Sequence, residues 1–212
     1  MTRKLFWQNP YQIELTSKVD VIDGNKIELA ETIFYAESGG QESDVGTIAG
    51  IPVIHAEKSG KRLVYTLESS PSFQVGDDVQ TLIDWQRRYA LMKLHFAAEV
   101  VLVLFTQFHP NIKKIGAHIS ANKSRIDFVS TENIKPLLAN IAIHAQQLLD
   151  AQLPIESAFS NEIEERRFWK VEGFSQVPCG GTHLRNTSEV GQINLTRSNL
   201  GKGKERVEIT IL

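Results

Sequence analysis

The chain has 212 residues, of which 42% are hydrophobic and 23% are charged, and its formal net charge is −2. This composition excludes a collagen, a disordered tail and a coiled-coil rod, and it is typical of an ordinary globular protein. The near balance of charge argues against indiscriminate binding of polyphosphates. A nucleic-acid partner would therefore need a local basic patch.

A single cysteine, Cys179, and short apolar runs indicate the cellular compartment. One cysteine cannot form an intrachain disulfide, which favours a reducing environment. The first ten residues hold no apolar run of signal-peptide length, and the longest apolar stretch, Val100–Phe105, is far shorter than a membrane span. We therefore expect a cytoplasmic protein without a membrane partner.

The residues up to about Asp84 follow the pattern of β structure. Alternating apolar residues flank short turns that contain Gly24 and Gly60, as in β-hairpins. The predicted strands are Lys18–Ile22, Lys26–Leu29, Ile51–His55, Arg62–Leu67 and Val79–Ile83. Short strands at this spacing favour a small barrel or a curled sheet. We therefore predict a β-rich, small β-barrel-like domain over residues 1–84.

Helical and strand signals both occur in the remainder of the chain. From Trp85 to about Phe108 helix formers dominate and apolar residues occur nearly all round, which predicts a buried helix. A strand signal follows at Arg125–Val129, and the helical period returns between Ile134 and Leu148. Further short strands are predicted near Ile155–Phe159, Arg167–Val171, Val190–Thr196 and Arg206–Leu212. The chain is therefore assigned to the α+β class, with a second domain over residues 85–212.

Four side chains of metal-binding type form two local pairs. His95 and Glu99 are four residues apart on the predicted helix and share one of its faces. Cys179 and His183 enclose two glycines that allow a tight backbone path. Cysteine, histidine and carboxylate side chains are the usual zinc ligands, so folding could join the two pairs in one tetrahedral site. The alternative for the helical pair is a local hydrogen bond.

A run rich in glycine and polar residues extends from Thr32 to Gly46. Within it, Gly39 and Gly40 could bring backbone N–H groups against a ligand, and Gln41 could add its amide. A hairpin loop whose glycines only satisfy backbone geometry is the alternative, which the pattern alone favours. The sequence contains no dinucleotide fingerprint and no P-loop, so we expect no nucleotide cofactor.

A second glycine-punctuated segment near the carboxyl end is basic. It carries Arg197, Lys202, Lys204 and Arg206 against a single acidic residue, Glu205. Extended basic side chains beside glycine suit contact with phosphate groups. A solvated turn between two strands explains the segment equally well.

Four motifs, taken in chain order, resemble those of the alanyl-tRNA editing proteins. These proteins are free-standing relatives of the editing domain of alanyl-tRNA synthetase, which is also related to that of threonyl-tRNA synthetase. The motifs are Phe34–Gly46, Asp84–His95, Arg125–Phe128 and Cys179–Gly191. The resemblance spans nearly the whole chain and implies a metal-dependent editing domain over residues 85–212. The first motif resembles the family's glycine-rich motif, which occurs in members with an amino-terminal β domain.

The resemblance implies a hydrolase that deacylates tRNA for alanine wrongly charged with serine or glycine. It also implies one zinc ion per chain, with His95, Cys179 and His183 as ligands. Because no general base adjacent to Cys179 is identifiable from the sequence, we expect this residue to be a ligand and not a nucleophile. The family's second helical histidine is replaced here by Glu99, and the common threonine after the first histidine is replaced by Phe96. Three readings of Glu99 follow: a zinc ligand, a base that orients water over a three-ligand ion, or the mark of a lost metal site.

Such an enzyme needs polar groups that recognise what alanine lacks. A pocket that accepts alanine cannot strongly exclude glycine or serine, so a second site must select the wrong amino acid. Hydrogen-bonding groups such as Thr32 and Gln41 would favour a serine hydroxyl, beside the backbone of Gly39 and Gly40. The expected partner is the acceptor end of tRNA for alanine. A non-catalytic tRNA-binding relative and a hydrolase of small non-RNA esters are the rival functions, and the oligomeric state is left open.

Overall fold

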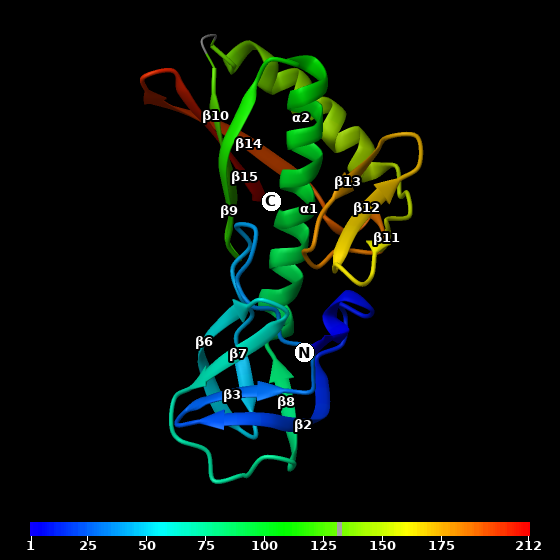
Figure 1. The fold of residues 1–212 in the computed structure, drawn as a ribbon. Coiled ribbons are helices and arrows are strands. Elements are labelled where there is room, and N and C mark those ends of the chain that lie inside the picture. The colour runs from blue at the N-terminus through cyan, green and yellow to red at the C-terminus, as the bar shows by residue number, and fades with distance from the viewer. Residues whose placement is uncertain (131–132) are drawn as a thin grey trace. The chain divides into compact units, whose positions relative to one another are not determined.

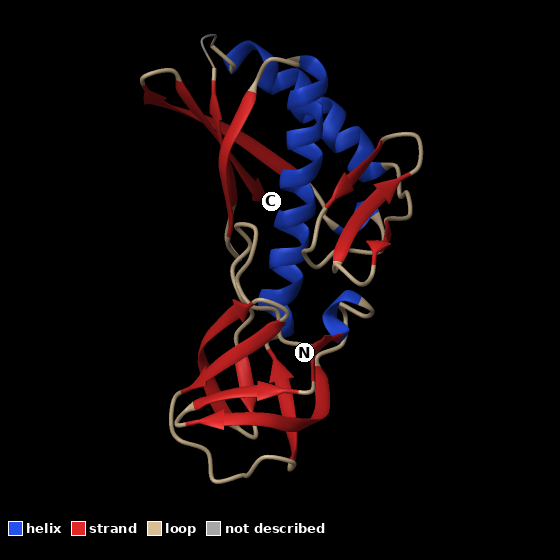
Figure 2. Cartoon of the chain, in the orientation of Figure 1, coloured by secondary structure: helices blue, strands red, loops and turns tan. Residues whose placement is uncertain are grey.

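The structure is a computed structural model that describes residues 1–130 and 133–212. The fold is of the mixed α+β type, and most of its regular elements are strands (Figures 1 and 2). The described residues contain two α-helices, α1 (Trp85–Phe108) and α2 (Lys135–Asp150). The chain divides into two compact units. Unit 1 comprises residues 1–38 and 42–89, and unit 2 comprises residues 39–41 and 90–212.

Six strands of unit 1 pair in a closed antiparallel ring in the order β2-β3-β7-β6-β5-β8, and β8 pairs back with β2. A closed ring leaves none of these strands as a free edge. Their bounds are β2 (Glu14–Asp23), β3 (Lys26–Leu29), β5 (Gly46–Ile48), β6 (Ile51–Ser59), β7 (Arg62–Leu67) and β8 (Asp78–Ile83). The short strands β1 (Arg3–Lys4) and β4 (Glu31–Thr32) form a separate parallel pair, and β1 is followed by a 3₁₀ turn, Leu5–Trp7.

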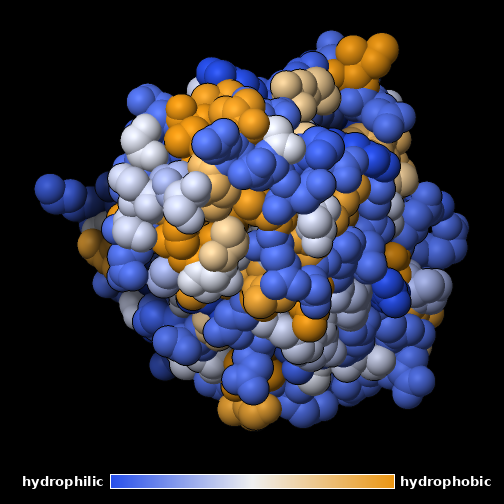
Figure 3. Space-filling model, turned by 90° about the horizontal axis from the view of Figure 1, so that it is seen from below, coloured by the Kyte–Doolittle hydropathy of each residue, from blue (hydrophilic) through white to orange (hydrophobic). Residues whose placement is uncertain are grey.

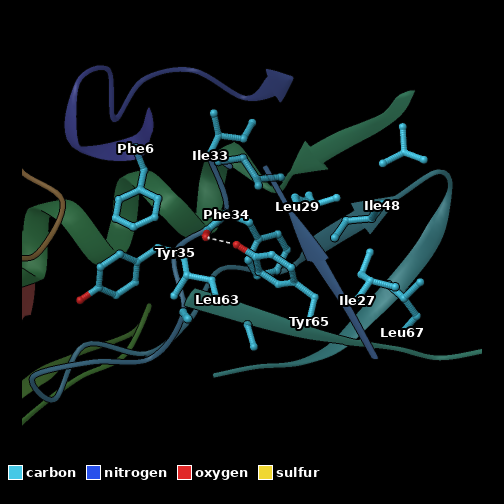
Figure 4. Packing of buried hydrophobic residues seen from close by; sticks show 14 of the residues in the cluster. Phe6, Ile27, Leu29, Ile33, Phe34, Tyr35, Ile48, Leu63, Tyr65 and Leu67 are labelled. Atoms are coloured by element: carbon cyan, nitrogen blue, oxygen red, sulfur yellow. Dashed lines mark hydrogen bonds between the residues drawn. The ribbon is translucent and has the colours of Figure 1, made fainter. Parts of the chain in front are cut away.

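Aromatic and aliphatic side chains fill the interior of unit 1 (Figure 4). The rings of Phe34 and Tyr65 pack edge to face with centroids 5.3 Å apart. The buried Tyr65 hydroxyl donates to the carbonyl oxygen of Phe34 at 2.9 Å, as Figure 4 shows. Burial raises the pKa of Tyr65 above its usual value, so the hydroxyl keeps the proton that this bond needs.

A fully buried arginine joins the two ends of the glycine-rich run to the start of α1. The Arg88 guanidinium donates to both carboxylate oxygens of Asp44 and to the carbonyl oxygens of Ile33 (2.6 Å) and Pro10 (2.9 Å). Removing one partner of such a pair would leave an uncompensated charge in the interior. The pair therefore fixes where the run leaves unit 1 and where it returns.

Helix α1 packs against both sheets of unit 2, which lie on opposite sides of it in Figure 1. The ring of Phe105 contacts Phe128 on one sheet, and the ring of Phe96 contacts Trp169 on the other. The first sheet has the order β14-β15-β10-β9 and the second β11-β12-β13. The bounds are β9 (Lys113–Ile119), β10 (Ser124–Val129), β11 (Glu156–Asn161), β12 (Arg166–Val171), β13 (Ser175–Pro178), β14 (Ile193–Gly201) and β15 (Lys204–Ile211), with a 3₁₀ turn at Thr187–Glu189.

Both predicted hairpins and both predicted helices are confirmed. Gly24 lies at the β2–β3 turn and Gly60 at the β6–β7 turn, each with a positive φ that favours glycine. Five strands of the described residues were missed: the two-residue strands β1 and β4, and the strands β5, β9 and β13. Strand β9 begins with two lysines and contains Gly116, so its own residues carry little strand signal. Its pairing with β10 makes it a strand.

By length and composition, α1 is the one helix of the described chain that could cross a membrane. The core helix of a soluble protein passes the same test, and 61% of the most apolar 18-residue window of α1 is buried in the protein. One such helix is weak support for a membrane span. The face drawn in Figure 3 is mostly hydrophilic, with apolar residues in small separate groups.

Candidate metal centre

Three of the four predicted metal ligands meet in unit 2. His95 projects from α1, whereas Cys179 and His183 lie in the loop after β13. Their donor atoms all lie within 4.8 Å of one another, and His95 Nε2 is 3.2 Å from Cys179 Sγ. The two imidazole rings stand nearly perpendicular, with centroids 5.3 Å apart. Two histidines and one cysteine form a donor set that suits zinc.

The backbone of the loop approaches the His95 ring closely. A Cβ atom at Gly181 would collide with the imidazole of His95 and lie 2.9 Å from Gln41 Oε1. A Cβ atom at Gly180 would meet open space. Of the two glycines in the motif, Gly181 is therefore the one that the packing requires. The Cys179 N–H donates to the Arg167 carbonyl oxygen at 2.9 Å, which ties the start of the loop to β12.

Each histidine is held through the ring nitrogen that lies outside the cluster. His95 Nδ1 is hydrogen-bonded to Gln41 Oε1, and Gln41 Nε2 donates to Thr182 Oγ1 at 3.0 Å. His183 Nδ1 pairs with the Ser157 hydroxyl at 3.2 Å. A proton held on Nδ1 leaves Nε2 with a free lone pair, which is the form that binds a metal.

The protonation state and the unused hydrogen-bonding capacity of the two histidines also suit a metal ion. The Nε2 atom of His183 is buried and has no hydrogen-bond partner in the structure. Burial lowers the pKa of His95 and sets that of His183 well below its usual value, so both rings are neutral at pH 7. Burial raises the pKa of the Cys179 thiol to about 12. A bound zinc ion would satisfy the orphaned nitrogen and displace the thiol proton.

The fourth predicted ligand, Glu99, lies beside this set. Its Oε2 atom accepts a hydrogen bond from the indole N–H of Trp169 at 2.7 Å. Its Oε1 atom is 3.8 Å from His95 Nε2. The set of residues whose donor atoms all lie within 4.8 Å of one another does not include Glu99.

Residues 39–41 of the glycine-rich run belong to unit 2, so the run places Gln41 in that unit. The Gly40 carbonyl oxygen accepts from the Ile119 N–H at 2.7 Å, and Gln41 forms a parallel bridge with Ile119. Gly40 has a φ of 91°, and a Cβ atom there would lie 2.6 Å from the Ala117 carbonyl oxygen. Glycine is therefore required at position 40 for close approach to β9.

Thr32 lies in the core of unit 1, where its side chain is fully buried. Its hydroxyl pairs with the Tyr65 hydroxyl at 2.7 Å and accepts from the Phe34 N–H at 3.0 Å. These contacts give Thr32 a local role in supporting the chain that leads into the glycine-rich run.

The basic segment forms the β14–β15 hairpin, in which two of the four predicted tRNA contacts are paired with acids. Arg197 donates to both oxygens of Glu205, at 2.8 and 2.5 Å. Arg206 donates to both oxygens of Asp127, at 2.6 and 2.9 Å. Lys202 and Lys204 are exposed at the hairpin tip.

Ser157 contacts His183, Thr182 contacts Gln41 and Trp169 contacts Glu99. None of these three contacting residues was singled out from the sequence. Thr182 lies inside the Cys179–His183 motif, so its position between two predicted ligands was the sequence signal that could have identified it. Trp169 and Ser157 lie on strands of the β11-β12-β13 sheet, where their residue types suggest only packing or exposure. Their role depends on contacts with residues distant in the sequence.

The comparisons with known proteins cover the whole chain. Residues 167–208 match the family described as threonyl and alanyl tRNA synthetase second additional domain, and residues 6–87 match class II (A) tRNA synthetases. The chain is 33% identical over 213 residues to alanyl-tRNA editing protein AlaX-M of Pyrococcus horikoshii, with 99% of this chain and 97% of the relative covered. It is 31% identical over 250 residues to the AlaX-M protein of Methanosarcina acetivorans, with both chains fully covered. It is 30% identical to an alanine–tRNA ligase of Methanococcus aeolicus, of which it covers 25%.

Proposed function

The chain belongs to the family of alanyl-tRNA editing proteins, and we propose that it is a zinc-dependent deacylase that acts in trans on mischarged tRNA for alanine. The substrate carries serine or glycine on the acceptor end. The observation that carries this proposal is the His95–Cys179–His183 cluster, with its orphaned nitrogen, in a chain similar to editing proteins over its full length. Because aminoacyl-tRNA is made and used in the cytoplasm, we place the protein there.

In this proposal His95 Nε2, Cys179 Sγ and His183 Nε2 hold the zinc ion. When bound, zinc supplies a Lewis acid that favours attack of water on the ester. Gln41 and Ser157 keep the two histidines in the tautomer that offers Nε2. The two histidine ligands are buried, which limits the access of bulk water to their rings.

Substrate selection is assigned to the glycine-rich segment. The Gln41 amide is fully buried and uses one donor on Thr182 and one acceptor on His95, and its remaining donor and acceptor are the groups that we propose for a serine hydroxyl. Gly39 is exposed, and its backbone is open to a ligand. Alanine would leave the remaining amide groups without partners, which disfavours hydrolysis of the correct product. Thr32 supports this segment from the core of unit 1.

The proposed tRNA contacts are Lys202 and Lys204, while Arg197 and Arg206 shape the hairpin through their acidic partners. We also propose that the editing domain comprises residues 85–212. The β-rich domain then comprises residues 1–84, and its closed ring of strands is a small barrel. The glycine-rich run is the part of this domain that contributes to the site.

A deacylation assay tests the function directly. tRNA for alanine is charged in turn with serine, glycine and alanine, and release of the amino acid is measured with wild type and with Cys179→Ala. We expect wild type to release serine or glycine faster than alanine, and the variant to lose this activity.

Two outcomes would favour the rival functions. Absence of release together with absence of zinc would indicate a non-catalytic tRNA-binding relative. Equal hydrolysis of a minimal aminoacyl ester, with no preference for tRNA, would indicate a hydrolase of small esters.

A further inference from the structure

We propose that Glu99 is the general base that takes a proton from the attacking water, and that Trp169 is the positioning residue that holds its carboxylate. This inference rests on the proposed function and assigns a role to the position at which this chain departs from the family pattern. The sequence alone left Glu99 between a ligand, a base and the mark of a lost site. The contacts of the carboxylate, together with the composition of the compact donor set, favour the second reading, and zinc content tests it against the first.

Trp169 fixes one oxygen of Glu99. The indole N–H donates to Oε2 at 2.7 Å. The Trp169 side chain is fully buried, with the Phe96 ring edge to face at 5.2 Å and the Phe174 ring stacked at 6.4 Å. Because the indole is confined by packing and can only donate, it holds the carboxylate by one oxygen and leaves the other free.

The free oxygen, Oε1, points toward the metal centre without joining its donor set. It is 3.8 Å from His95 Nε2, which is longer than a hydrogen bond. Ligands of one tetrahedral zinc ion lie about 2.0–2.3 Å from it, so any two of them are separated by roughly 3–4 Å, a range that includes the 3.8 Å to His95. Glu99 is set apart by its distance from the donor atoms of the other two residues. The compact set within 4.8 Å contains His95, Cys179 and His183 and does not contain Glu99.

Three protein ligands with a carboxylate beside them are the arrangement of a catalytic zinc site. Structural zinc sites are closed by four protein ligands, whereas catalytic ones use three and keep a position for water or substrate. A carboxylate one helical turn from a ligand histidine is within reach of that position. The carboxylate of Glu99 is held in a defined orientation, which also argues against the reading that the metal site has been lost.

The reaction balances with this residue alone as the proton carrier. Water loses a proton to Glu99 Oε1 while its oxygen forms a bond to the carbonyl carbon of the ester. The bond between that carbon and the ribose oxygen then breaks, and the proton passes from Glu99 to the ribose oxygen. The products are the free amino acid and tRNA with a free terminal hydroxyl.

The test compares Glu99→Gln, Trp169→Phe and the double variant with wild type. We expect about one zinc per chain in all four proteins and unchanged absorption spectra after cobalt substitution, because the three ligands remain. The single-turnover deacylation rate should fall about 10²–10⁴-fold in Glu99→Gln. It should fall by roughly tenfold in Trp169→Phe, which keeps the aromatic packing but removes the N–H donor.

The double variant separates positioning from structural support. If Trp169 acts through Glu99, the double variant should be no slower than Glu99→Gln. If the two losses multiply, Trp169 supports the fold and is not a positioning residue. Trp85→Phe, on the part of α1 in unit 1, is the matched control and should leave the rate unchanged.

Other outcomes would overturn the assignment of Glu99. Loss of zinc in Glu99→Gln would make Glu99 a ligand, and a full rate in that variant would remove it from the mechanism. Either result leaves wild-type deacylation, and hence the proposed function, intact. Failure of wild type to deacylate any mischarged tRNA would instead reject the proposed function and this inference together.

Discussion

Gln41 and Ser157 hold the two histidines of the candidate centre by hydrogen bonds outside the cluster. The Gln41 amide is itself oriented, because its Nε2 group donates to Thr182 at 3.0 Å while its Oε1 atom faces His95 Nδ1. A histidine whose outer nitrogen is anchored needs less ordering when it binds a metal. In the proposed function, Gln41 would therefore couple the glycine-rich run to metal affinity as well as to substrate selection.

Replacing Gln41 with leucine should weaken zinc binding by about 10–100-fold, which is the usual effect of removing a partner of a ligand histidine. Gln41→Glu should weaken it less, because the acceptor oxygen for His95 Nδ1 is retained. A competition titration against a chromogenic chelator measures both. Gln80→Leu, which changes an exposed glutamine on β8, is the control. Wild-type affinity in Gln41→Leu would show that His95 is oriented by packing alone.

Asp127 makes unit 2 sensitive to acid. The hydrogen bonds from Arg206, assisted by the charge of Arg125, hold the pKa of this carboxyl below its usual value. A depressed pKa contributes stability above the unfolded pKa of about 3.9, and that contribution is lost as the pH falls through the folded pKa. The arginines are partly exposed, so the contribution is discounted for screening by solvent.

Asp127→Asn should lower the free energy of unfolding by about 1 kcal/mol at pH 7. The difference from wild type should shrink at acidic pH, as the wild-type carboxyl takes up a proton at its lowered pKa. Denaturant unfolding at the two pH values measures this, with Asp20→Asn at an exposed position of β2 as the control. A difference that persisted at low pH would indicate that shape, and not charge, makes Asp127 stabilising.

Among the elements, the β14–β15 hairpin combines paired arginines with exposed lysines. Arg197 and Arg206 are held by Glu205 and Asp127, so their charges are largely compensated. The hairpin tip places Lys202 between two glycines, and all three residues have positive φ. Among the described residues, the positive charge of the hairpin that has no acidic partner therefore lies at its tip.

The double variant Lys202→Ala, Lys204→Ala should bind tRNA more weakly and with a smaller dependence on salt. Each phosphate contact contributes about 0.7–0.9 to the slope of log K against log salt, so two lost contacts should reduce the slope by about 1.5. Binding measured across a series of salt concentrations gives the slope. Lys58→Ala, Lys61→Ala, at the β6–β7 hairpin, is the matched control. Equal slopes in the two double variants would place the phosphate contacts elsewhere.

At the scale of the whole molecule, the metal centre would link distant parts of the chain. His95 and Cys179 are 84 residues apart in sequence, on α1 and after β13. An ion that binds the folded protein and not the unfolded chain stabilises the fold by mass action. The proposed zinc ion would therefore join α1 to the β11-β12-β13 sheet and have a structural effect beyond its chemistry.

Removal of zinc should lower the melting temperature. At about 1,000 times its dissociation constant, a ligand contributes roughly 4 kcal/mol, which corresponds to a shift of about 10 °C for a chain of this size. Calorimetry with and without a chelator measures the shift. Cys179→Ala should melt at the same temperature under both conditions. A chelator-dependent shift of wild-type size in that variant would exclude Cys179 as a ligand.

The sequence by itself determined most of the longer elements and the residue types of the site. Alternation and turn glycines predicted the β2–β3 and β6–β7 hairpins, and the apolar pattern predicted α1 and α2. These signals act over a few neighbouring residues, so they can be read locally. The spacing of the His95 and Cys179 motifs also indicated which residues could meet around a metal.

The tertiary structure decided which partner each polar side chain takes. Gln41 and His95 are 54 residues apart, Glu99 and Trp169 are 70 apart, and Asp127 and Arg206 are 79 apart. No local periodicity encodes such pairs. A hydrogen bond or ion pair needs two atoms within about 3 Å, and only the packing of α1 and the sheets brings these atoms together. The same packing separated Glu99 from the compact ligand set, which the one-turn spacing could not show.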